Sequence, residues 1–439
     1  MTIEQKRIAV IGSGISGIAA AYFLHKKDYN VEIIESDSKI GGRAGSIQLH
    51  DKLIDIGGKN IGRKYTLFRQ FINEMGNHEL EFFGINSSTV QDGKLFTIDS
   101  EKKIASVLNL LQLVEVSSFV KFIRLALAVK KNDRNGFLDG PFFTNLSLKH
   151  DDQPITSYFP PRFNNNFLRP IVIRMNGSEP EDYYLGNLGS NVRMVLDKYD
   201  QLKNGMSLLF KDFEKSVPIL RNTKVEGIIK EGNKVTGIAA RNSQGVKRKF
   251  YDGVVIATPA INSSTLLKDT FSELAEHLQK FYYNPVTLAV VRYKKNIFNP
   301  SIRAIVFDKN TALSNAGCYG INDLNIVRYT LSGNKAKQKI SENSDPSEVI
   351  DLAEKALSRF VPVSKDLRED FVYKHFKIGL CAYTPFHHKV FTDIQKILAK
   401  IPCLGLTGDY VRGASLEACF RAAKEAVDVF DKKMRMGDC

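Results

Sequence analysis

A glycine-rich segment near the start of the chain has the residue types and spacing that bind a dinucleotide. Its glycines, in the pattern GxGxxG, are Gly12, Gly14 and Gly17. The first permits a tight turn, the second lets the backbone approach a pyrophosphate, and the third lets a helix pack closely on a strand. That helix, starting near Ile15 and Ser16, would point free N–H groups and the positive end of its dipole at the phosphates.

An acidic residue follows at the distance that this pattern requires. Glu35 comes directly after the apolar segment 31–34, about 20 residues beyond the glycines. Its carboxylate can accept hydrogen bonds from the ribose hydroxyls of NAD or FAD, and it would repel a 2′-phosphate. The segment therefore predicts a dinucleotide site, without separating NAD from FAD.

Two later segments carry glycines and a cation that suit the same ligand. The first reads IGGRAGS and contains Gly42 and Arg43, and the second reads DIGG and ends in Gly57 and Gly58. Glycines in such loops let backbone N–H groups approach phosphate oxygens, and Arg43 adds a positive charge.

Taken together, these segments resemble the flavin-containing amine oxidoreductase superfamily. That group includes monoamine and polyamine oxidases, protoporphyrinogen oxidases and phytoene-type desaturases. NAD-dependent dehydrogenases have no reason to keep the IGGR and DIGG segments. The resemblance implies that the cofactor is FAD, held without a covalent bond.

Further segments extend the resemblance over most of the chain. KNGMSL, at residues 203–208, is similar to a glycine-methionine segment that precedes a helix in the family. NTKVEGI contains Val225, at a place where the family's backbone meets the adenine. VVIATP contains Ala257 and Thr258, which the resemblance places near the cofactor.

A last segment resembles the family's C-terminal flavin motif. It reads LTGDY, containing Gly408 and Asp409, and is followed by ASLEA. In the family the acidic residue, here Asp409, binds the ribityl chain. The helix that starts at Ser415 and Leu416 would point its N-terminus at the pyrimidine end of the flavin, where negative charge develops on reduction.

The resemblance implies an FAD-dependent oxidoreductase that removes a hydride from a small organic substrate. Flavin performs the redox chemistry, and the protein places a C–H bond against it. Short matches to the desaturases and protoporphyrinogen oxidases favour carbon–carbon or ring dehydrogenation of a lipophilic or anionic substrate. The alternatives are an amine oxidase that yields imine and hydrogen peroxide, and a flavin-binding protein without turnover.

The catalytic residues stay open, with three candidates near the flavin. Amine oxidases often keep a lysine on one strand, where this chain has Thr287 or Leu288. They also sandwich the amine between two aromatic rings, for which Tyr383 supplies one member and Ser415 stands in place of the other. These departures favour oxidation at carbon over oxidation of an amine.

Other residues have both a functional and a structural interpretation. Cys381 is either a point of covalent flavin attachment or a small buried hydrophobe, and the latter is favoured. His387 and His388, in an expected strand-to-loop segment, are either a proton relay or structural. Three arginines either bind a substrate carboxylate or serve the structure: Arg162, Arg169 and Arg174.

The elements that must position these residues form an α/β pattern, α+β overall. Short apolar runs predict buried strands, and they alternate with helices over residues 16–26 and 415–430. We expect a Rossmann-like FAD-binding domain built from three discontinuous segments: residues 1–75, 201–264 and 395–439. An inserted substrate domain of mixed sheet and helix takes the rest: residues 76–200, which are helix-rich, and 265–394, with strands and one helix over 346–360.

Composition bounds the function further. The chain has 439 residues and a net charge of +14, so a single small module is excluded and anionic partners are favoured. Five scattered cysteines without a CxxC pair predict no metal site and a reducing compartment. Because no zinc finger or RNA-binding motif is present, we expect a small-molecule substrate and no nucleic acid. We expect a cytoplasmic location, and the oligomeric state is left open.

One amphipathic segment leaves peripheral membrane contact as an alternative. Residues 117–131 combine basic side chains with an apolar stripe of Phe119, Phe122, Ile123, Ala126 and Leu127. An interfacial helix has this composition, but so does a helix packed on a core, and the core interpretation is favoured.

Overall fold

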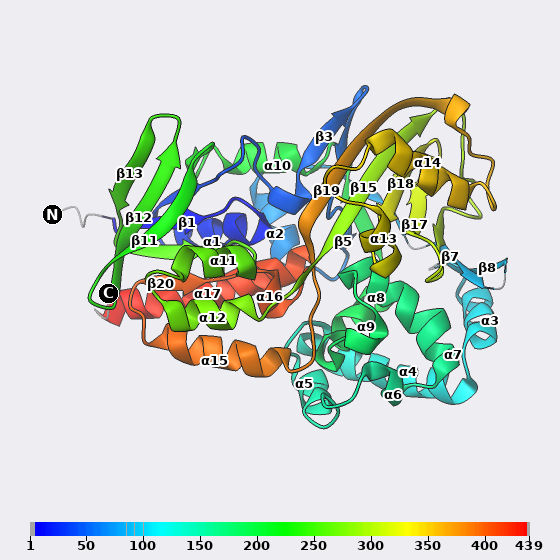
Figure 1. The fold of residues 1–439 in the computed structure, drawn as a ribbon, viewed down its shortest axis with the longest axis horizontal. Coiled ribbons are helices and arrows are strands. Elements are labelled where there is room, and N and C mark those ends of the chain that lie inside the picture. Colours follow the sequence, from blue (N-terminus) through cyan, green and yellow to red (C-terminus); the bar gives the residue numbers. More distant parts are fainter. Residues whose placement is uncertain (1–4, 85, 92, 100, 437–439) are drawn as a thin grey trace.

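A parallel sheet assembled from distant parts of the chain forms one half of the molecule (Figure 1). The computed structural model describes residues 5–84, 86–91, 93–99 and 101–436. The sheet has five strands in the order β10-β2-β1-β14-β20. Their bounds are β1 (Arg7–Ile11), β2 (Asn30–Ile34), β10 (Ile219–Leu220), β14 (Gly253–Ile256) and β20 (Leu404–Leu406).

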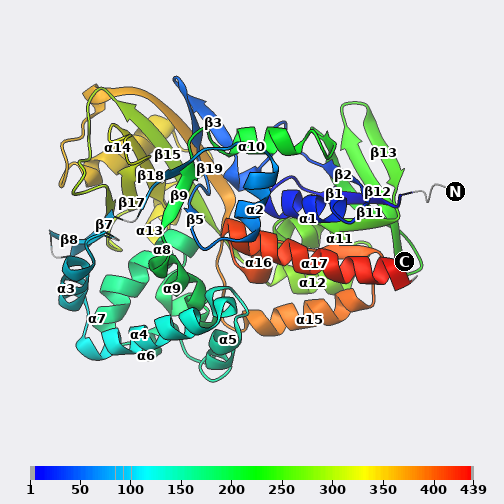
Figure 2. The same cartoon turned by 180° about the vertical axis from the view of Figure 1, so that it is seen from behind.

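The apolar character of these strands explains why they lie inside. Ile8, Val10, Val254 and Ile256 are fully buried, as expected of parallel strands covered on both faces. Helices α1 (Ile15–His25) and α17 (Leu416–Met436) pack against each other beside the sheet (Figure 2). A three-stranded antiparallel sheet flanks it elsewhere: β11 (Lys224–Glu231), β12 (Lys234–Asn242) and β13 (Gly245–Phe250).

A seven-stranded sheet forms the second half, in the order β19-β15-β18-β17-β16-β7-β8. Its strands are β7 (Asn86–Gln91), β8 (Lys94–Asp99), β15 (Tyr283–Tyr293), β16 (Ala304–Val306), β17 (Leu313–Cys318), β18 (Ile326–Leu331) and β19 (Arg368–Cys381). Side chains alternate between the two faces of a strand. Val327 and Tyr329 therefore enter a core with α14 (Pro346–Leu357) and α13 (Asn334–Lys339), whereas Arg328 faces the other way, into a cavity.

The helices of the first insertion form a separate layer at the lower right of Figure 1. Phe122, Phe143, Phe163 and Val192 lie in a core of their own. The helices are α3 (Lys103–Leu113), α4 (Val116–Lys131), α5 (Pro141–Ser147), α6 (Ile155–Tyr158), α7 (Pro161–Phe163), α8 (Arg169–Asn176) and α9 (Leu188–Leu196). Smaller elements complete the chain between these parts, among them α2 (Leu67–Glu74) and α10 (Met206–Phe213).

The α/β fold class is confirmed, but the expectation of a single helix in residues 265–394 is wrong. Besides α14, this stretch holds α12 (Ser272–Gln279), α13 and the start of α15 (His387–Ala399). The expected strand-to-loop segment at His387 is thus a helix start. The start of this helix could not be predicted from the local sequence pattern, because the turn before it places Phe386 at a positive φ of 63°. A residue other than glycine rarely adopts this conformation, so the sequence gives no sign of it.

The amphipathic stripe expected over residues 117–131 is divided between two faces of α4. Phe122 and Ala126 are buried in the helical core, whereas Ile123 and Leu127 are exposed. Residues three or four apart share a helix face, and adjacent ones do not. The helix therefore packs on the core through one stripe and shows a second apolar stripe to solvent.

A buried carboxylate in the seven-stranded half supplies a test of the packing. Glu354, on α14, accepts hydrogen bonds from Tyr293 (2.6 Å) and from Arg368 (2.6 and 2.8 Å). Replacing Arg368 with Met leaves this carboxylate buried without its cation, and we expect a loss of about 3–5 kcal/mol in the free energy of unfolding.

A matched control lies on the same network. Lys365 pairs with Asp351, which Arg368 also contacts, but that lysine is exposed. Lys365→Met should therefore cost less than about 1 kcal/mol. Urea unfolding followed by far-UV circular dichroism measures both variants, and equal losses would contradict the assignment.

Candidate dinucleotide and substrate site

One large cavity lies between the parallel sheet and the seven-stranded sheet. Its volume is about 1310 Å³, above the range of about 300–1,000 Å³ typical of small-ligand sites. Residues that follow β1, β2, β14 and β20 line it, including Gly12, Glu35, Ala257 and Gly408. Ligands of parallel α/β sheets bind at these carboxyl ends.

The turn between β1 and α1 is built on glycine. A Cβ placed on Gly17 would lie 1.8 Å from the carbonyl oxygen of Gly12, and Gly12 itself has a φ of +95°. A Cβ on Gly14 would meet no protein atom within 4 Å. Gly17 thus serves the packing of helix on strand, whereas Gly14 borders the space where a ligand would approach the backbone.

The loops containing Arg43 and Gly57 are fastened to this turn through their backbones. Gly41 donates its N–H to the carbonyl of Ser13 at 2.9 Å, and a Cβ on Gly42 would lie 3.3 Å from the Cα of Gly14. A Cβ on Gly57 would lie 1.5 Å from the carbonyl oxygen of Arg43. Three segments distant in sequence therefore share one wall of the cavity.

The acidic residue at the end of β2 is fixed in place by the same turn. Glu35 Oε2 accepts hydrogen bonds from the backbone N–H and the hydroxyl of Ser13, each at 2.7 Å. Its Oε1 accepts the N–H of Asp37 at 2.8 Å. The carboxylate is held at the edge of the cavity, in the position that a ribose-binding group requires.

Asp409, which also lines the cavity, joins three parts of the chain. Its Oδ1 accepts the hydroxyl of Tyr283 (2.7 Å) and its Oδ2 accepts Arg43 Nη1 (2.8 Å). The Tyr383 hydroxyl donates to the backbone carbonyl of Asp409 at 2.8 Å. Burial, and then the Asp409 charge, hold the pKa of Tyr283 well above its usual value, so this phenol remains a donor.

The helix that follows begins at the cavity wall. Ser415 caps α17, because its Oγ accepts the N–H of Ala418 at 3.1 Å, and Leu416 lines the cavity beside it. Glu417 is fully buried and accepts N–H groups from the first turn of α2, Leu67 (3.3 Å) and Phe68 (3.0 Å). This fixes the direction in which the start of α17 points.

The structure brings the expected cofactor residues together around the cavity. Gly17 is the exception, since it packs under the turn and does not line the space. The residues that line it are Gly12, Gly14, Ile15, Ser16, Glu35, Gly42, Arg43, Gly57, Gly58, Val225, Ala257, Thr258, Gly408, Asp409, Ser415 and Leu416. A glycine-bordered helix start, a cation and an acidic strand end fit a dinucleotide.

Of the three candidates for positions near the flavin, two face the cavity. Leu288 and Tyr383 line it. Thr287 points to the opposite face of β15, where its Oγ1 lies 2.8 Å from His375 Nδ1. Because side chains alternate along a strand, Thr287 and Leu288 cannot both face the same space.

Cys381 and the histidine pair lie away from the cavity lining. Cys381 is buried, and burial followed by the Asp409 charge raises the pKa of its thiol well above the usual value. His387 is buried with its Nε2 2.8 Å from the carbonyl oxygen of Tyr410, and burial lowers its pKa to about 4. His388 lies 3.1 Å from the Tyr184 hydroxyl. These contacts are structural.

The three arginines do not form a cluster, which corrects the grouping drawn from their proximity in sequence. Arg162 donates to the carbonyl of Gln112, and Arg169 is paired with Glu179 and Glu181. Arg174 alone lines the cavity.

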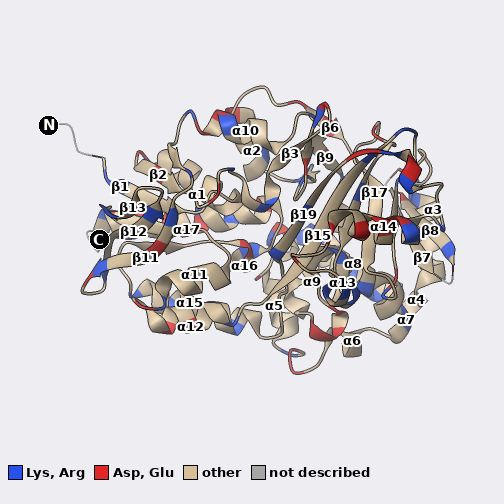
Figure 3. Ribbon diagram, turned by 45° about the horizontal axis from the view of Figure 1, so that its top comes forward, with Lys and Arg blue, Asp and Glu red and all other residues tan. Residues whose placement is uncertain are grey.

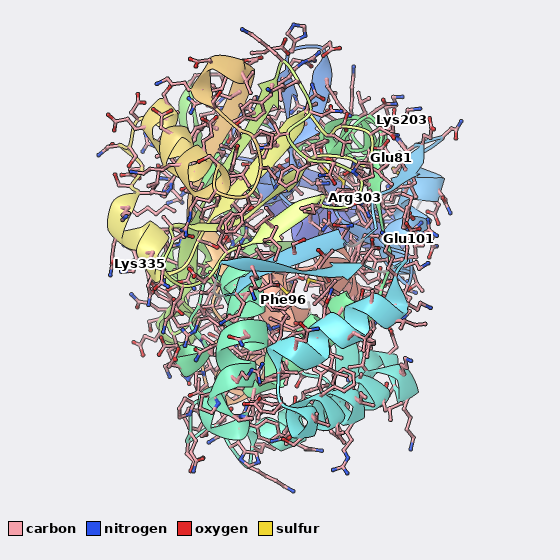
Figure 4. All side chains as sticks on the ribbon, turned by 90° about the vertical axis from the view of Figure 1, so that its right-hand side faces the viewer. Glu81, Phe96, Glu101, Lys203, Arg303 and Lys335 are labelled. Carbon is pink, nitrogen blue, oxygen red and sulfur yellow. The ribbon has the colours of Figure 1, made fainter. Side chains whose placement is uncertain are left out.

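Several lining residues were missed in the sequence. Lys59 directly follows Gly58, and Arg328 interrupts the apolar strand IVRYTL. A charged residue within such a strand is the signal that could have identified Arg328. Arg303, labelled in Figure 4, also lines the cavity and donates to the carbonyl of Phe83 at 3.0 Å.

The part of the cavity around Gly12, Glu35, Arg43 and Asp409 is called the cradle below, and it has the features expected of a dinucleotide site. The part lined by Leu288, Phe376, Arg174, Arg328 and Lys59 is called the chamber.

The chain belongs to the flavin-containing amine oxidoreductase family, whose sequence model matches residues 15–429. The family membership predicted from the sequence motifs is thus confirmed, and it implies a flavin cofactor.

Known proteins of several kinds are similar to this chain. An L-amino-acid oxidase of Sistrurus catenatus edwardsii is 30% identical over 87 residues, which span 20% of this chain and only 17% of that protein. A coproporphyrinogen III oxidase of Staphylococcus aureus is 23% identical over 300 residues, or 58% of this chain and 60% of that one. The solved structure of cyclohexylamine oxidase from Brevibacterium oxydans has the same fold, with a TM-score of 0.76, 16% identity and coverage of 98% and 100%.

The two glycines of the first turn can be tested as a matched pair. Gly14→Ala should fold normally, because its φ of −65° suits alanine and the Cβ meets no protein atom. It should weaken FAD binding by about tenfold or more, because the Cβ occupies the approach to the phosphates. Gly17→Ala should instead lower the Tm of the apoprotein by about 5 °C or more, because its Cβ collides with the Gly12 carbonyl.

Thermal unfolding of apoprotein and titration with FAD followed by flavin fluorescence separate the two effects. A Gly14→Ala variant that binds FAD as tightly as the parent chain would contradict the assignment of this turn.

Proposed function

We propose that the chain binds FAD without a covalent bond and removes a hydride from a carbon atom of a small organic substrate. The observation that carries this proposal is a single cavity that joins a dinucleotide cradle to a chamber on the seven-stranded sheet. FAD, when bound, accepts the two electrons of such an oxidation. The chain's own residues position the substrate and keep water out.

The cysteines support the absence of a covalent bond. Cys381 lies off the cavity. Cys419 and Cys318 do line it, but burial raises their thiol pKa values to about 12 and about 11. The thiolate is the nucleophilic form of cysteine, so these side chains are unreactive at neutral pH.

The wall that faces the cradle is apolar and rigid. Val286 and Leu288 of β15 and Phe376 of β19 line it, and β15 pairs with strands on both of its edges. A substrate pressed against this wall is oriented by packing. The C–H bond that breaks would give its hydride to the bound flavin, and the proton lost from the neighbouring atom would pass to solvent, so the step requires no dedicated general base of the protein. The apolar wall suits a lipophilic substrate body.

The charges of the chamber favour oxidation at carbon over oxidation of an amine. Lys59, Arg174 and Arg328 line it, and amines are themselves cationic at neutral pH. Like charges in a poorly solvated space repel strongly. Amines are nevertheless included as the second class of compound in the test described below, because cyclohexylamine oxidase shares the fold.

The test begins with the visible spectrum of the purified protein before and after acid precipitation. We expect flavin absorption bands and release of all the colour into the supernatant, because Cys318 and Cys419, the described cysteines that line the cavity, are not ionised at neutral pH. Colour retained in the pellet would contradict noncovalent binding, and a colourless protein that FAD cannot reconstitute would contradict the assignment as a whole.

Substrate class is then tested by anaerobic loss of the flavin absorbance. We expect bleaching by organic compounds with an activated C–H bond next to a ring or double bond. Matched primary and secondary amines should not bleach it. Bleaching by amines alone, with hydrogen peroxide formed in air, would identify an amine oxidase, and no bleaching by either class would indicate a flavin-binding protein without turnover.

A further inference from the structure

Two arginines face the substrate chamber without an acidic partner. Within the part of the chain that the structure describes, the side chain of Arg328 has no hydrogen bond or ion pair, and that of Arg174 has only a 3.7 Å contact with the sulfur of Met194. They come from β18 and α8, and the charge of Arg174 adds to burial in lowering the pKa of Arg328. Both side chains are only partly exposed, and both line the cavity. Guanidinium groups so removed from bulk water are normally paired, because an unpaired charge there is costly.

Several other arginines with little exposed surface are paired with carboxylates. Arg169 is paired with two glutamates, Arg368 with Glu354, and Arg412 with Asp139 and Glu425. Arg303, which also lines the cavity, donates only to the carbonyl of Phe83 among the described contacts, so arginines without a carboxylate partner gather around this space.

A third cation lies next to this pair. Lys59 Nζ is buried, donates to Gln201 and to the carbonyl of Tyr319 (2.7 Å), and lies 3.6 Å from the ring centre of Phe83. Burial first, and then the charge of Arg328, lower its pKa to about 7. Burial also lowers the pKa of Arg174 and of Arg328, but a guanidinium stays charged at neutral pH.

Carboxylates that would neutralise these cations lie elsewhere. Among the residues that line the cavity, Glu35, Asp37 and Glu226 are at the nucleotide end, and Asp409 is held by Arg43. Asp55, the acid whose charge acts on both Arg328 and Lys59, faces Ser46 and Met206, and burial raises its pKa. The chamber therefore has an excess of positive charge over an apolar wall.

We propose that Arg174, Arg328 and Lys59 form an anion subsite that binds the carboxylate of an organic acid substrate. This inference rests on the proposed function, and it names the substrate class. Two guanidinium groups from two different elements, α8 and β18, can each bind a carboxylate through paired N–H donors. The apolar body of the acid lies on Leu288 and Phe376, so the subsite orients it toward the cradle.

The test measures binding and does not depend on turnover. Decanoate and decanol serve as probes, because they share an apolar chain and differ in charge. Isothermal titration calorimetry of the purified flavin-loaded protein should show decanoate binding about tenfold or more tightly than decanol. Arg328→Met should remove that difference and leave decanol binding unchanged.

Controls keep the outcomes distinct. Arg162→Met removes an arginine outside the cavity and should leave decanoate affinity unchanged. Equal binding of the two probes by the parent chain, or an unchanged decanoate affinity in Arg328→Met, would overturn the subsite. If decanoate binds as expected but no organic acid bleaches the flavin, the proposed oxidation fails and the subsite stands.

A separate observation concerns the outer face of α3 and α4. Seven large apolar side chains on these two consecutive helices are between 41% and 81% exposed. Those on α4 follow a helical stripe with steps of four, three and four residues. The seven are Ile104, Val107, Leu108, Val116, Val120, Ile123 and Leu127.

The charged residues within these two helices are all basic. Neither helix contains Asp or Glu, whereas Lys103, Arg124, Lys130 and Lys131 are exposed on them; one glutamate, Glu101 or Glu115, precedes each helix. Acidic and basic residues are mixed over the rest of the ribbon (Figure 3). Both helices lie on the side turned to the viewer in Figure 4.

We propose that α3 and α4 rest on the surface of a membrane that carries anionic lipids. An apolar stripe with basic flanks is the composition of an interfacial helix. Among the described residues, no helix is both long enough and apolar enough to cross a bilayer. The basic side chains meet lipid phosphates while Val120, Ile123 and Leu127 enter the headgroup region.

Vesicle sedimentation tests this contact. The protein should sediment with vesicles of phosphatidylcholine and phosphatidylglycerol at low salt, and less with pure phosphatidylcholine. Val120→Glu with Leu127→Glu should reduce the bound fraction about fivefold or more. Val246→Glu, on the exposed hairpin strand β13, introduces the same charge elsewhere and should bind as the parent chain does.

Circular dichroism should show that both variants are folded. No sedimentation of the parent chain, or equal sedimentation of the double variant, would overturn the proposal. A dimer in light scattering that the double variant abolishes would also overturn it, because a second copy of the chain would then cover this face.

Discussion

Backbone contacts that only glycine permits are the constraint on which the site depends. The carbonyl of Gly12 lies where a Cβ of residue 17 would be, and the carbonyl of Arg43 lies where a Cβ of residue 57 would be. These contacts bring helix α1 and two loops to one wall of the cavity. Because a dinucleotide is recognised largely by backbone N–H groups, the ligand site is created by the same close packing that assembles the parallel sheet.

Asp409 connects this wall of the cavity to the seven-stranded half of the molecule through hydrogen bonds. Its carboxylate holds Tyr283, at the start of β15, and Arg43, in the loop after β2. Strand β15 pairs with β19 and β18 in the seven-stranded sheet, so the chamber wall is positioned relative to the cradle by one buried charge and its partners. This explains how two halves with separate cores form a single cavity.

Charge is distributed unequally between the two ends of that cavity. The cradle holds charges of both signs, among them the ion pair of Arg43 and Asp409, whereas the chamber keeps Arg174 and Arg328 without carboxylates. An unpaired charge that is largely removed from bulk water lowers stability, and proteins concentrate such costs at functional sites. This unequal distribution of charge is the observation from which we propose an anionic substrate for the chamber.

The sequence by itself determined the family, the α/β class and the cofactor wall, because turn and strand-end chemistry resides in short contiguous segments such as Gly12–Gly17 and Glu35. It did not determine which charged residues face the chamber. Arg162, Arg169 and Arg174 are equivalent as residue types, and only packing decided that Arg174 faces inward. Arg328 lines the same cavity from a strand about 150 residues further along the chain, so the two arginines come together only when α8 packs on the seven-stranded sheet.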